Sequence, residues 1–390
     1  MRIKELPLHV RHTFYYDVRS GLLIGLFGGF LFPFIPIVGR KIGATDMQVA
    51  LLAAAPYLAN AFALLWTEDV FGKGRVWYVV WPSVAGRLLL LGMFYVTAPA
   101  WYTLLILVYM IVTAIPFPSY ASIMKTNYPD ALRGRLMSYV RVGIAITWIA
   151  ASALGGWILE KDTFNFRLIF PLAALFGVLS ALQFRFIKIR KEKKERENFA
   201  GIKRLASPFK DNSFGRYLVA YTLFEFALLL ALPVYPLVLV DEVRISNLAT
   251  GVYGSIYSSM WLAGFFFWGR FLDKFSVKRS LVAIFAVASA IPLLYLLTRD
   301  VYFLGIAQGL SGFIFAATEL ANYVVITRLA SPGDVPRYMA ANIALGGLRG
   351  ATAPFLGTGL LALAGPDVVF SLSLFLCLGA FALAWGTVKM

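Results

Sequence analysis

Long apolar runs, separated by short clusters of Gly, Pro and charged residues, extend along almost the whole chain. Each run is close to the length of about 20 largely apolar residues that an α-helix needs to cross a bilayer. With the polar clusters taken as helix ends, the pattern predicts twelve helices, over residues 18–38, 47–68, 76–97, 101–124, 137–159, 167–187, 215–240, 248–270, 279–298, 302–328, 338–364 and 367–387. The predicted fold is therefore an all-α integral membrane protein with twelve transmembrane helices.

The longest polar interruption divides the chain near its middle. Residues 187–213, IKIRKEKKERENFAGIKRLASPFKDNS, are dense in charge and too long for a tight turn, so we interpret them as a basic linker. The predicted domains are an N-terminal six-helix bundle over 1–186, the linker, and a C-terminal six-helix bundle over 214–390.

The two predicted halves also resemble each other in sequence. Three short segments recur in the same order at nearly constant separation: PFIPIV (33–38) with PVYPLV (233–238), DVFGKGR (69–75) with DKFSVKR (273–279), and GRLMS (134–138) with PRYMA (336–340). Internal repeats of this kind are typical of transporter folds. The pattern indicates a duplicated six-helix unit and two pseudo-symmetric bundles.

The composition supports a membrane protein, and in a membrane protein a high positive net charge has a different meaning than in a soluble one. Of the 390 residues, 60% are hydrophobic and 14% are charged, and the formal net charge is +16. Soluble domains are typically about half apolar and a quarter charged. Because an excess of Lys and Arg is usual in cytoplasmic loops, we expect membrane lipid around the protein and no nucleic-acid partner.

The distribution of Lys and Arg predicts the orientation. With twelve spans, 27 of the 36 basic residues lie on the side of the termini and the linker, and 6 lie on the other side. Cytoplasmic loops carry the basic excess. We therefore expect a multi-pass protein of the cytoplasmic (inner or plasma) membrane with both termini and the linker in the cytoplasm.

Two loop motifs carry a resemblance to a known family. Gly269, Asp273, Lys274 and Lys278 follow the pattern G-x-L-x-D-R-x-G-R-K/R after the eighth predicted helix, and DVFGKGR is a weaker copy after the second. Together with YPDALRGR (128–135) and the duplicated layout, these motifs resemble the major facilitator superfamily of secondary transporters. The resemblance implies two six-helix bundles around a central cavity that opens alternately to either face.

The same resemblance implies a gating role for the loop residues. Asp273, and Asp69 in the other half, would be acids of a latch that holds neighbouring helix ends together, with Arg337 as a cation partner for Asp273. The residues expected to take part in gating are Asp69, Arg75, Arg133, Arg135, Arg141, Gly269, Asp273, Lys274 and Arg337.

Ionisable residues inside the predicted helices are candidates for function, because a charge in a spanning helix is costly. Arg87 and Arg349 suit an anionic group of a substrate, and Glu225 and Glu319 suit the loading and release of protons. The alternative for each is a permanent ion pair between an arginine and an acid. The sequence leaves both possibilities open.

Polar and aromatic residues deeper in the helices complete the predicted substrate site. They are Asn60, Tyr57, Trp148, Tyr235, Tyr257 and Trp261, and helix packing is the alternative role for each. Buried amides are few, whereas a sugar needs several partners for its hydroxyls. An amphipathic or anionic organic solute fits the remaining set of aromatic, acidic and arginine side chains better.

Other classes of function find little support. The chain has two histidines and one cysteine, so we expect no metal site and no cofactor, and no nucleophile–base spacing or GxxxxGKS/T phosphate loop is present. We therefore expect a monomeric transporter and not an enzyme, acting as a symporter or antiporter coupled to protons or another ion. Efflux of lipophilic or drug-like compounds, and a non-transporting sensor or scaffold, are the alternatives.

Overall fold

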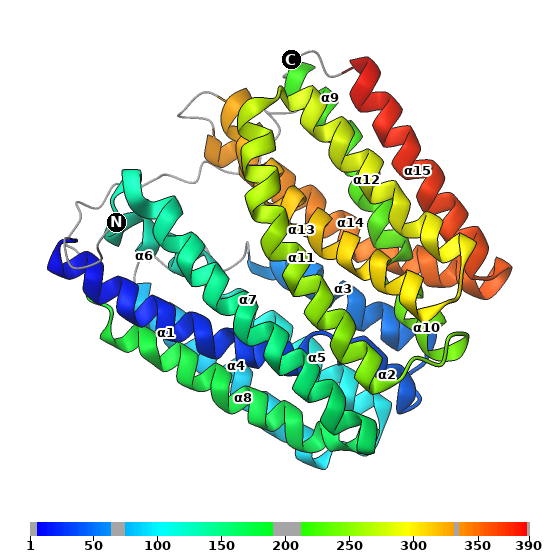
Figure 1. Ribbon diagram of the computed structural model, residues 1–390, viewed down its shortest axis with the longest axis horizontal. Helices are drawn as coiled ribbons and strands as arrows, with labels where there is room; N and C mark the ends of the chain where they lie inside the picture. The colour runs from blue at the N-terminus through cyan, green and yellow to red at the C-terminus, as the bar shows by residue number, and fades with distance from the viewer. Residues whose placement is uncertain (1–5, 64–74, 190–211, 331–334, 388–390) are drawn as a thin grey trace. The chain divides into compact units, whose positions relative to one another are not determined.

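The computed structural model describes residues 6–63, 75–189, 212–330 and 335–387, and these residues form helices and connecting turns with no strand among them (Figure 1). In chain order the elements are α1 (Leu8–Leu31), α2 (Ile35–Lys41), α3 (Asp46–Ala63), α4 (Arg75–Leu89), η4 (Leu90–Tyr95), α5 (Pro99–Ala114), α6 (Phe117–Asn127), α7 (Asp130–Lys161), η5 (Thr163–Asn165), α8 (Phe166–Gln183), η6 (Phe184–Phe186), α9 (Asn212–Ala231), α10 (Val234–Asp241), α11 (Asn247–Lys274), α12 (Val277–Leu297), α13 (Val301–Leu329), α14 (Val335–Ala364) and α15 (Pro366–Thr387).

Every predicted range overlaps a helix, or two helices joined by a bend, so the all-α fold is confirmed. Within the described residues, eight helical stretches are long and apolar enough to cross a membrane, and the apolar helix Pro99–Ala114 is shorter. The count of twelve spans stays a prediction. The largest difference in boundaries is at the first helix, which begins at Leu8 and not near residue 18.

Proline bends separate α1 from α2 and α9 from α10. Pro33 and Pro233 lie at these breaks, at matching places in the two halves. Proline lacks the N–H that would bond to the carbonyl four residues earlier, which for Pro33 is the carbonyl of Gly29. The Ser152 hydroxyl of α7 donates to that oxygen instead, at 3.2 Å. Such replacement of freed backbone bonds is what makes proline tolerable in apolar surroundings.

The described chain forms two compact units. The first comprises Met1–Ala44, Phe62–Arg196 and Ser246–Ser255, and the second comprises Thr45–Ala61, Glu197–Ile245 and Ile256–Met390. Residues of α3 therefore group with the second unit, and the first turns of α11 group with the first. The bundle boundaries at 186 and 214 stay a prediction from the sequence, and most of the proposed linker lies outside the described residues.

In the first unit, α1 packs against α7 and α8 (Figure 1). Glycines make the approach of α1 to α7 possible, because a Cβ on Gly25 would overlap the carbonyl oxygen of Ile144, and a Cβ on Gly29 would overlap that of Trp148. Small residues at close helix–helix contacts are typical of membrane proteins, where dispersion contacts and not water exclusion drive association.

The first turns of α11 are tied to α7 in the same unit. A Cβ on Gly156 would lie 2.9 Å from the Cα of Gly251, so the two helices touch through their backbones. Asn247 donates to the carbonyl of Leu159 at 2.8 Å and accepts from Lys41 Nζ at 2.8 Å. These contacts join α2, α7 and α11 at the end predicted to face away from the cytoplasm.

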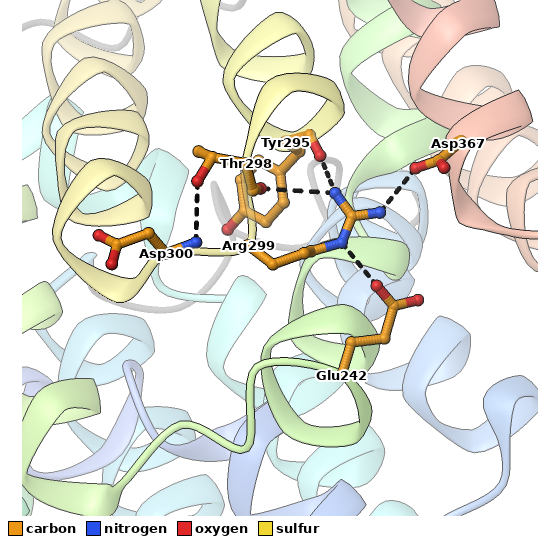
Figure 2. A network of polar contacts seen from close by, with 6 residues as sticks. All are labelled: Glu242, Tyr295, Thr298, Arg299, Asp300 and Asp367. Carbon is orange, nitrogen blue, oxygen red and sulfur yellow. Dashed lines mark hydrogen bonds and ion pairs between the residues drawn. The ribbon is translucent and has the colours of Figure 1, made fainter.

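In the second unit, Arg299 joins three segments at the end of the helices (Figure 2). Its guanidinium contacts Glu242, which follows α10, and Asp367 in the first turn of α15, both at 2.6 Å, and it also donates to the carbonyl of Tyr295. Burial by itself lowers the pKa of Arg299, but the hydrogen bonds and charges of the two carboxylates outweigh that effect and raise the pKa. The arginine therefore holds the ends of α10, α12 and α15 together.

We expect Gly25→Ala to destabilise the first unit, because the added methyl group displaces α7 and overpacking costs about 1–3 kcal/mol. Gly359→Ala is the matched control, since a Cβ there meets nothing within 4 Å. Thermal unfolding of the purified protein in detergent measures both variants. Equal melting temperatures for the two would contradict the packing described for α1 and α7.

We expect Arg299→Gln to lower the free energy of unfolding by about 1 kcal/mol, as is usual for partly exposed ion pairs. The difference from the unmodified protein should shrink as salt is added, since salt screens exposed charges. Arg244→Gln is the control, because Arg244 is exposed and has no ion pair in the described chain. An Arg299 effect no larger than the Arg244 effect at low salt would show that the network is not stabilising.

Candidate functional site

A buried ion pair lies in the second unit between α14 and α9. Arg349 is 3% exposed, and its Nη2 lies 2.5 Å from Glu225 Oε2. Its Nη1 donates to the hydroxyl of Thr222 at 2.8 Å. Thr222 and Glu225 are three residues apart on α9 and therefore share one face of that helix. Of the two roles left open by the sequence, the structure shows the ion pair for Glu225 and Arg349.

Tyrosines surround this pair. Tyr221 donates to Glu225 Oε1 at 2.7 Å, and the Arg349 guanidinium lies 5.7 Å from the centre of its ring. Tyr57 of α3 packs against α14 where Gly350 leaves room for it, and its hydroxyl interacts electrostatically with Glu225 and Arg349. The surroundings thus combine hydroxyl donors with aromatic faces that attract a cation.

The guanidinium keeps its Nε donor unused. Arg349 Nε is buried and has no partner among the described residues. An arginine presents five N–H donors in a planar fork that matches the two oxygens of a carboxylate. The pair with Glu225 therefore leaves a donor edge that an anion can occupy.

Tyr257 and Glu319 belong to the same side of the second unit. Tyr257 of α11 interacts electrostatically with both Tyr57 and Glu319 of α13, and the Glu319 side chain is exposed. Trp261, one turn along α11 from Tyr257, packs edge-to-face on Phe265 at 4.9 Å. The structure thus brings four predicted residues, Tyr57, Tyr257, Glu225 and Arg349, into one neighbourhood with Glu319 at its edge.

In the first unit, Arg87 of α4 lies between α1 and α8. Its Nη1 donates to the carbonyl of Gly177 at 2.5 Å, and its guanidinium lies 5.3 Å from the centre of the Phe27 ring. A Cβ on residue 177 would lie 2.7 Å from Arg87 Cδ, so glycine makes room for the side chain. Arg87 Nε is buried and unpartnered, and no described Asp or Glu lies within ion-pair distance of this arginine.

The remaining predicted substrate residues make no hydrogen bond or ring contact with Arg87 or Arg349 within the described chain, or their side chains are not described. Trp148 stacks on Phe32 at 5.5 Å in the first unit, and its Nε1 is buried without a partner. Tyr235 packs between Tyr295 and Phe370, at 4.5 and 5.4 Å, in an aromatic cluster of the second unit. The side chain of Asn60 lies outside the described residues.

The predicted latch acid has no partner among the residues that the structure describes. Asp273 is exposed and makes no hydrogen bond or ion pair within the described chain. The end of α11 is held by Arg328 of α13, which donates to the carbonyl of Leu272 at 2.8 Å and lies 3.4 Å from that of Phe275. Sequence reasoning did not select Arg328, although a basic residue in the last turn of a helix is a frequent partner for free carbonyls.

The other predicted gating residues are distributed as follows. Arg133 donates to the carbonyls of Lys125 and Tyr128, at 2.9 and 3.3 Å, and so covers the end of α6. Arg141 interacts electrostatically with Tyr120, and Arg135 is exposed. The Nζ of Lys274 lies 5.7 Å from the centre of the Phe275 ring. Gly269 is in open space, since a Cβ there would meet nothing within 4 Å. Asp69 and the side chains of Arg75 and Arg337 lie outside the described residues.

The sequence prediction missed one buried acid altogether. Asp17 lies inside α1 and is 2% exposed. Because the first helix was expected to begin at residue 18, Asp17 was counted with the polar N-terminal segment. The spacing of Thr13, Asp17 and Ser20, four and three residues apart, is the helical signal that extends the element towards the N-terminus.

Comparison with solved structures supports a transporter fold. The chain is 14% identical to the nucleoside transporter NupG, with a TM-score of 0.74 over 95% of this chain and 98% of that one. It is 12% identical to a D-xylose-proton symporter, with a TM-score of 0.72 over 98% of each chain. It is 16% identical to the human organic anion transporter MFSD10, with a TM-score of 0.67 over 97% of this chain and 100% of that one.

At sequence identities this low, these comparisons show a similar fold and nothing about function. A search of curated proteins finds no match. The sequence profile of the Major Facilitator Superfamily, by contrast, matches residues 20–235 and 217–389, which is nearly the whole chain. The two matches agree with the internal repeat of the sequence. The chain belongs to the major facilitator superfamily.

Proposed function

We propose that this protein is a secondary active transporter that moves a small organic anion across the cytoplasmic membrane by alternating access. The observation that carries the proposal is the Arg87 guanidinium, which lies among apolar helices without a carboxylate partner in the described chain. A charge in such surroundings is costly unless it is paired. A negatively charged substrate supplies the missing partner.

The contacts of Arg87 fit a carboxylate or a similar oxyanion. One carbonyl and one aromatic face satisfy part of the guanidinium, while part of the side-chain surface stays exposed. Arginine binds planar oxyanions in a bidentate manner and keeps its charge when buried. The Phe27 ring beside it favours a solute that also has an apolar part.

Arg349 is proposed as the second anion contact. Its free Nε–H can donate to an oxygen of the anion without loss of the pair with Glu225. Tyr57 and Tyr257 add hydroxyl donors and aromatic surface close by. The organic anion transporter among the similar structures has a substrate class of the same kind by its printed name, which supports the proposal only as an analogy.

Proton coupling is the proposed source of energy. Glu225, which pairs with Arg349 at 2.5 Å, is the first candidate for the coupling site. Glu319, with its exposed side chain beside Tyr257, is the second candidate. The expected orientation, with termini and linker in the cytoplasm, rests on the distribution of basic residues.

We expect organic anions to raise the melting temperature of the purified protein, and Arg87→Gln to weaken their apparent affinity about tenfold or more. Loss of a charge-assisted hydrogen bond costs about 1.5–3 kcal/mol, and Arg87→Lys should retain part of the effect. A thermal-shift screen with anionic, neutral and cationic metabolites at two pH values measures this. Stabilisation by cationic amphiphiles alone would contradict anion transport and favour efflux of lipophilic cations.

We expect Glu225→Gln to destabilise the protein by about 3–5 kcal/mol, because it leaves the Arg349 charge buried without its partner. Arg349→Met should also destabilise it, and the double variant should recover much of the loss. A double-mutant cycle on the free energy of unfolding measures the coupling, with Thr222→Val as the control for one neutral hydrogen bond. Additive effects of the two substitutions would show that the pair is not formed.

A further inference from the structure

Asp17 is a buried acid that the proposed mechanism does not use. It is the tenth residue of α1 and is 2% exposed. Tyr128 donates to its Oδ2 at 2.8 Å, and Tyr120 lies 3.4 Å from its Oδ1. Both tyrosines come from α6 or from the residue that follows it. The carboxyl group therefore joins α1 to the end of α6 within the first unit.

No cation pairs with this acid in the described chain, since no Lys, Arg or His lies within ion-pair distance of Asp17. Two arginines interact with its tyrosine partners. Arg141 of α7 interacts electrostatically with Tyr120, and Arg133 is bonded to the backbone carbonyl of Tyr128.

The other contacts around Asp17 are neutral. From η6, Phe184 belongs to the same apolar cluster as Tyr128. From α8, Ser180 bonds to Ser20, one turn along α1, at 2.8 Å. On the other side, Asn127 donates to Thr13 at 3.0 Å. Thr13, Asp17 and Ser20 thus form a polar line on one face of α1, with the acid as its only ionisable member.

The surroundings of Asp17 contain features that favour the neutral acid and features that favour the carboxylate. Burial without a cation disfavours the carboxylate, whereas two hydroxyl donors stabilise it. A protonated carboxyl group gains a donor of its own and gives up acceptor capacity, so the bond from Tyr128 weakens when the proton arrives. Proton binding therefore changes the tie between α1 and α6 without leaving a buried charge unpaired.

We propose that Asp17 is a reversible proton-binding site of the first unit, and that its protonation state controls the attachment of α1 to α6 through Tyr128. Its role as a further coupling site, beside Glu225 and Glu319, rests on the proposed function. Its role as a proton-binding site does not. The same helix carries Phe27, ten residues further on, against Arg87. At about 1.5 Å per residue that is roughly 15 Å, so movement of α1 links the proton site to the proposed anion contact.

The test of proton binding is an infrared titration of the purified, substrate-free protein between acid and neutral pH. We expect a carbonyl-stretch band of a buried carboxylic acid that appears on acidification, disappears in Asp17→Asn, and shifts in frequency in Tyr128→Phe. Asp162→Asn, an exposed acid of the same unit, is the control and should keep the band. An unchanged band in a folded Asp17→Asn protein, or no such band in the unmodified protein, would overturn the site.

A second measurement separates this site from the proposed function. In proteoliposomes supplied with the anion that gives the largest thermal shift, Asp17→Asn should lose accumulation driven by a pH gradient and keep substrate exchange at equal pH. Loss of both, in a protein that still binds the anion, would overturn the coupling role of Asp17. If no anion shifts the melting temperature, the proposed substrate class fails, while the infrared titration still decides whether Asp17 binds a proton.

Discussion

A charged side chain persists among apolar helices only when neighbouring groups compensate for the water that it has lost. This constraint organises both units. In the second unit, Arg349 meets Glu225, Thr222 and the face of Tyr221. In the first unit, Asp17 meets two tyrosine hydroxyls, and Arg87 meets one carbonyl and one ring. The three centres differ in how completely the described residues compensate the charge. Arg87 is the least compensated of them, and it is therefore the centre proposed to bind an external anion.

Backbone geometry makes these centres possible. Gly177 leaves space for the Arg87 side chain, and Gly350 leaves space for Tyr57 beside the ion pair. The break at Pro33 frees a carbonyl, and Ser152 of α7 supplies its hydrogen bond. Small residues and prolines thus set where helices approach and bend, and the polar side chains are positioned as a consequence. The arginine network of Figure 2 performs a different task, since it fastens helix ends where the chain is partly exposed.

Much of the fold was predictable because its signals are local. Apolar runs bounded by polar clusters predicted twelve ranges, each of which overlaps a helix in the same order, and the repeat of PFIPIV as PVYPLV placed the two proline bends at matching positions. The start of the first helix was not predicted, because its first turns are mostly polar, with His9, Arg11 and His12 exposed and only the inward face buried. That error removed Asp17 from the candidates. The latch assigned to Asp273 by resemblance stays a prediction, because the side chain of its expected partner, Arg337, lies outside the described residues, and within them Arg328 holds that helix end.

The sequence by itself determined the membrane class, the all-helical order and the identity of the costly residues, because hydropathy and charge along the chain are properties of each segment alone. The tertiary structure decided which neighbouring groups compensate the burial of each ionisable side chain. Arg349 and Glu225 are 124 residues apart, and Asp17 and Tyr128 are 111 apart. Pairing over such separations depends on how helices pack, and no local pattern contains it. Among the described residues the same packing places no acid within ion-pair distance of Arg87, and the proposed anion contact depends on that observation.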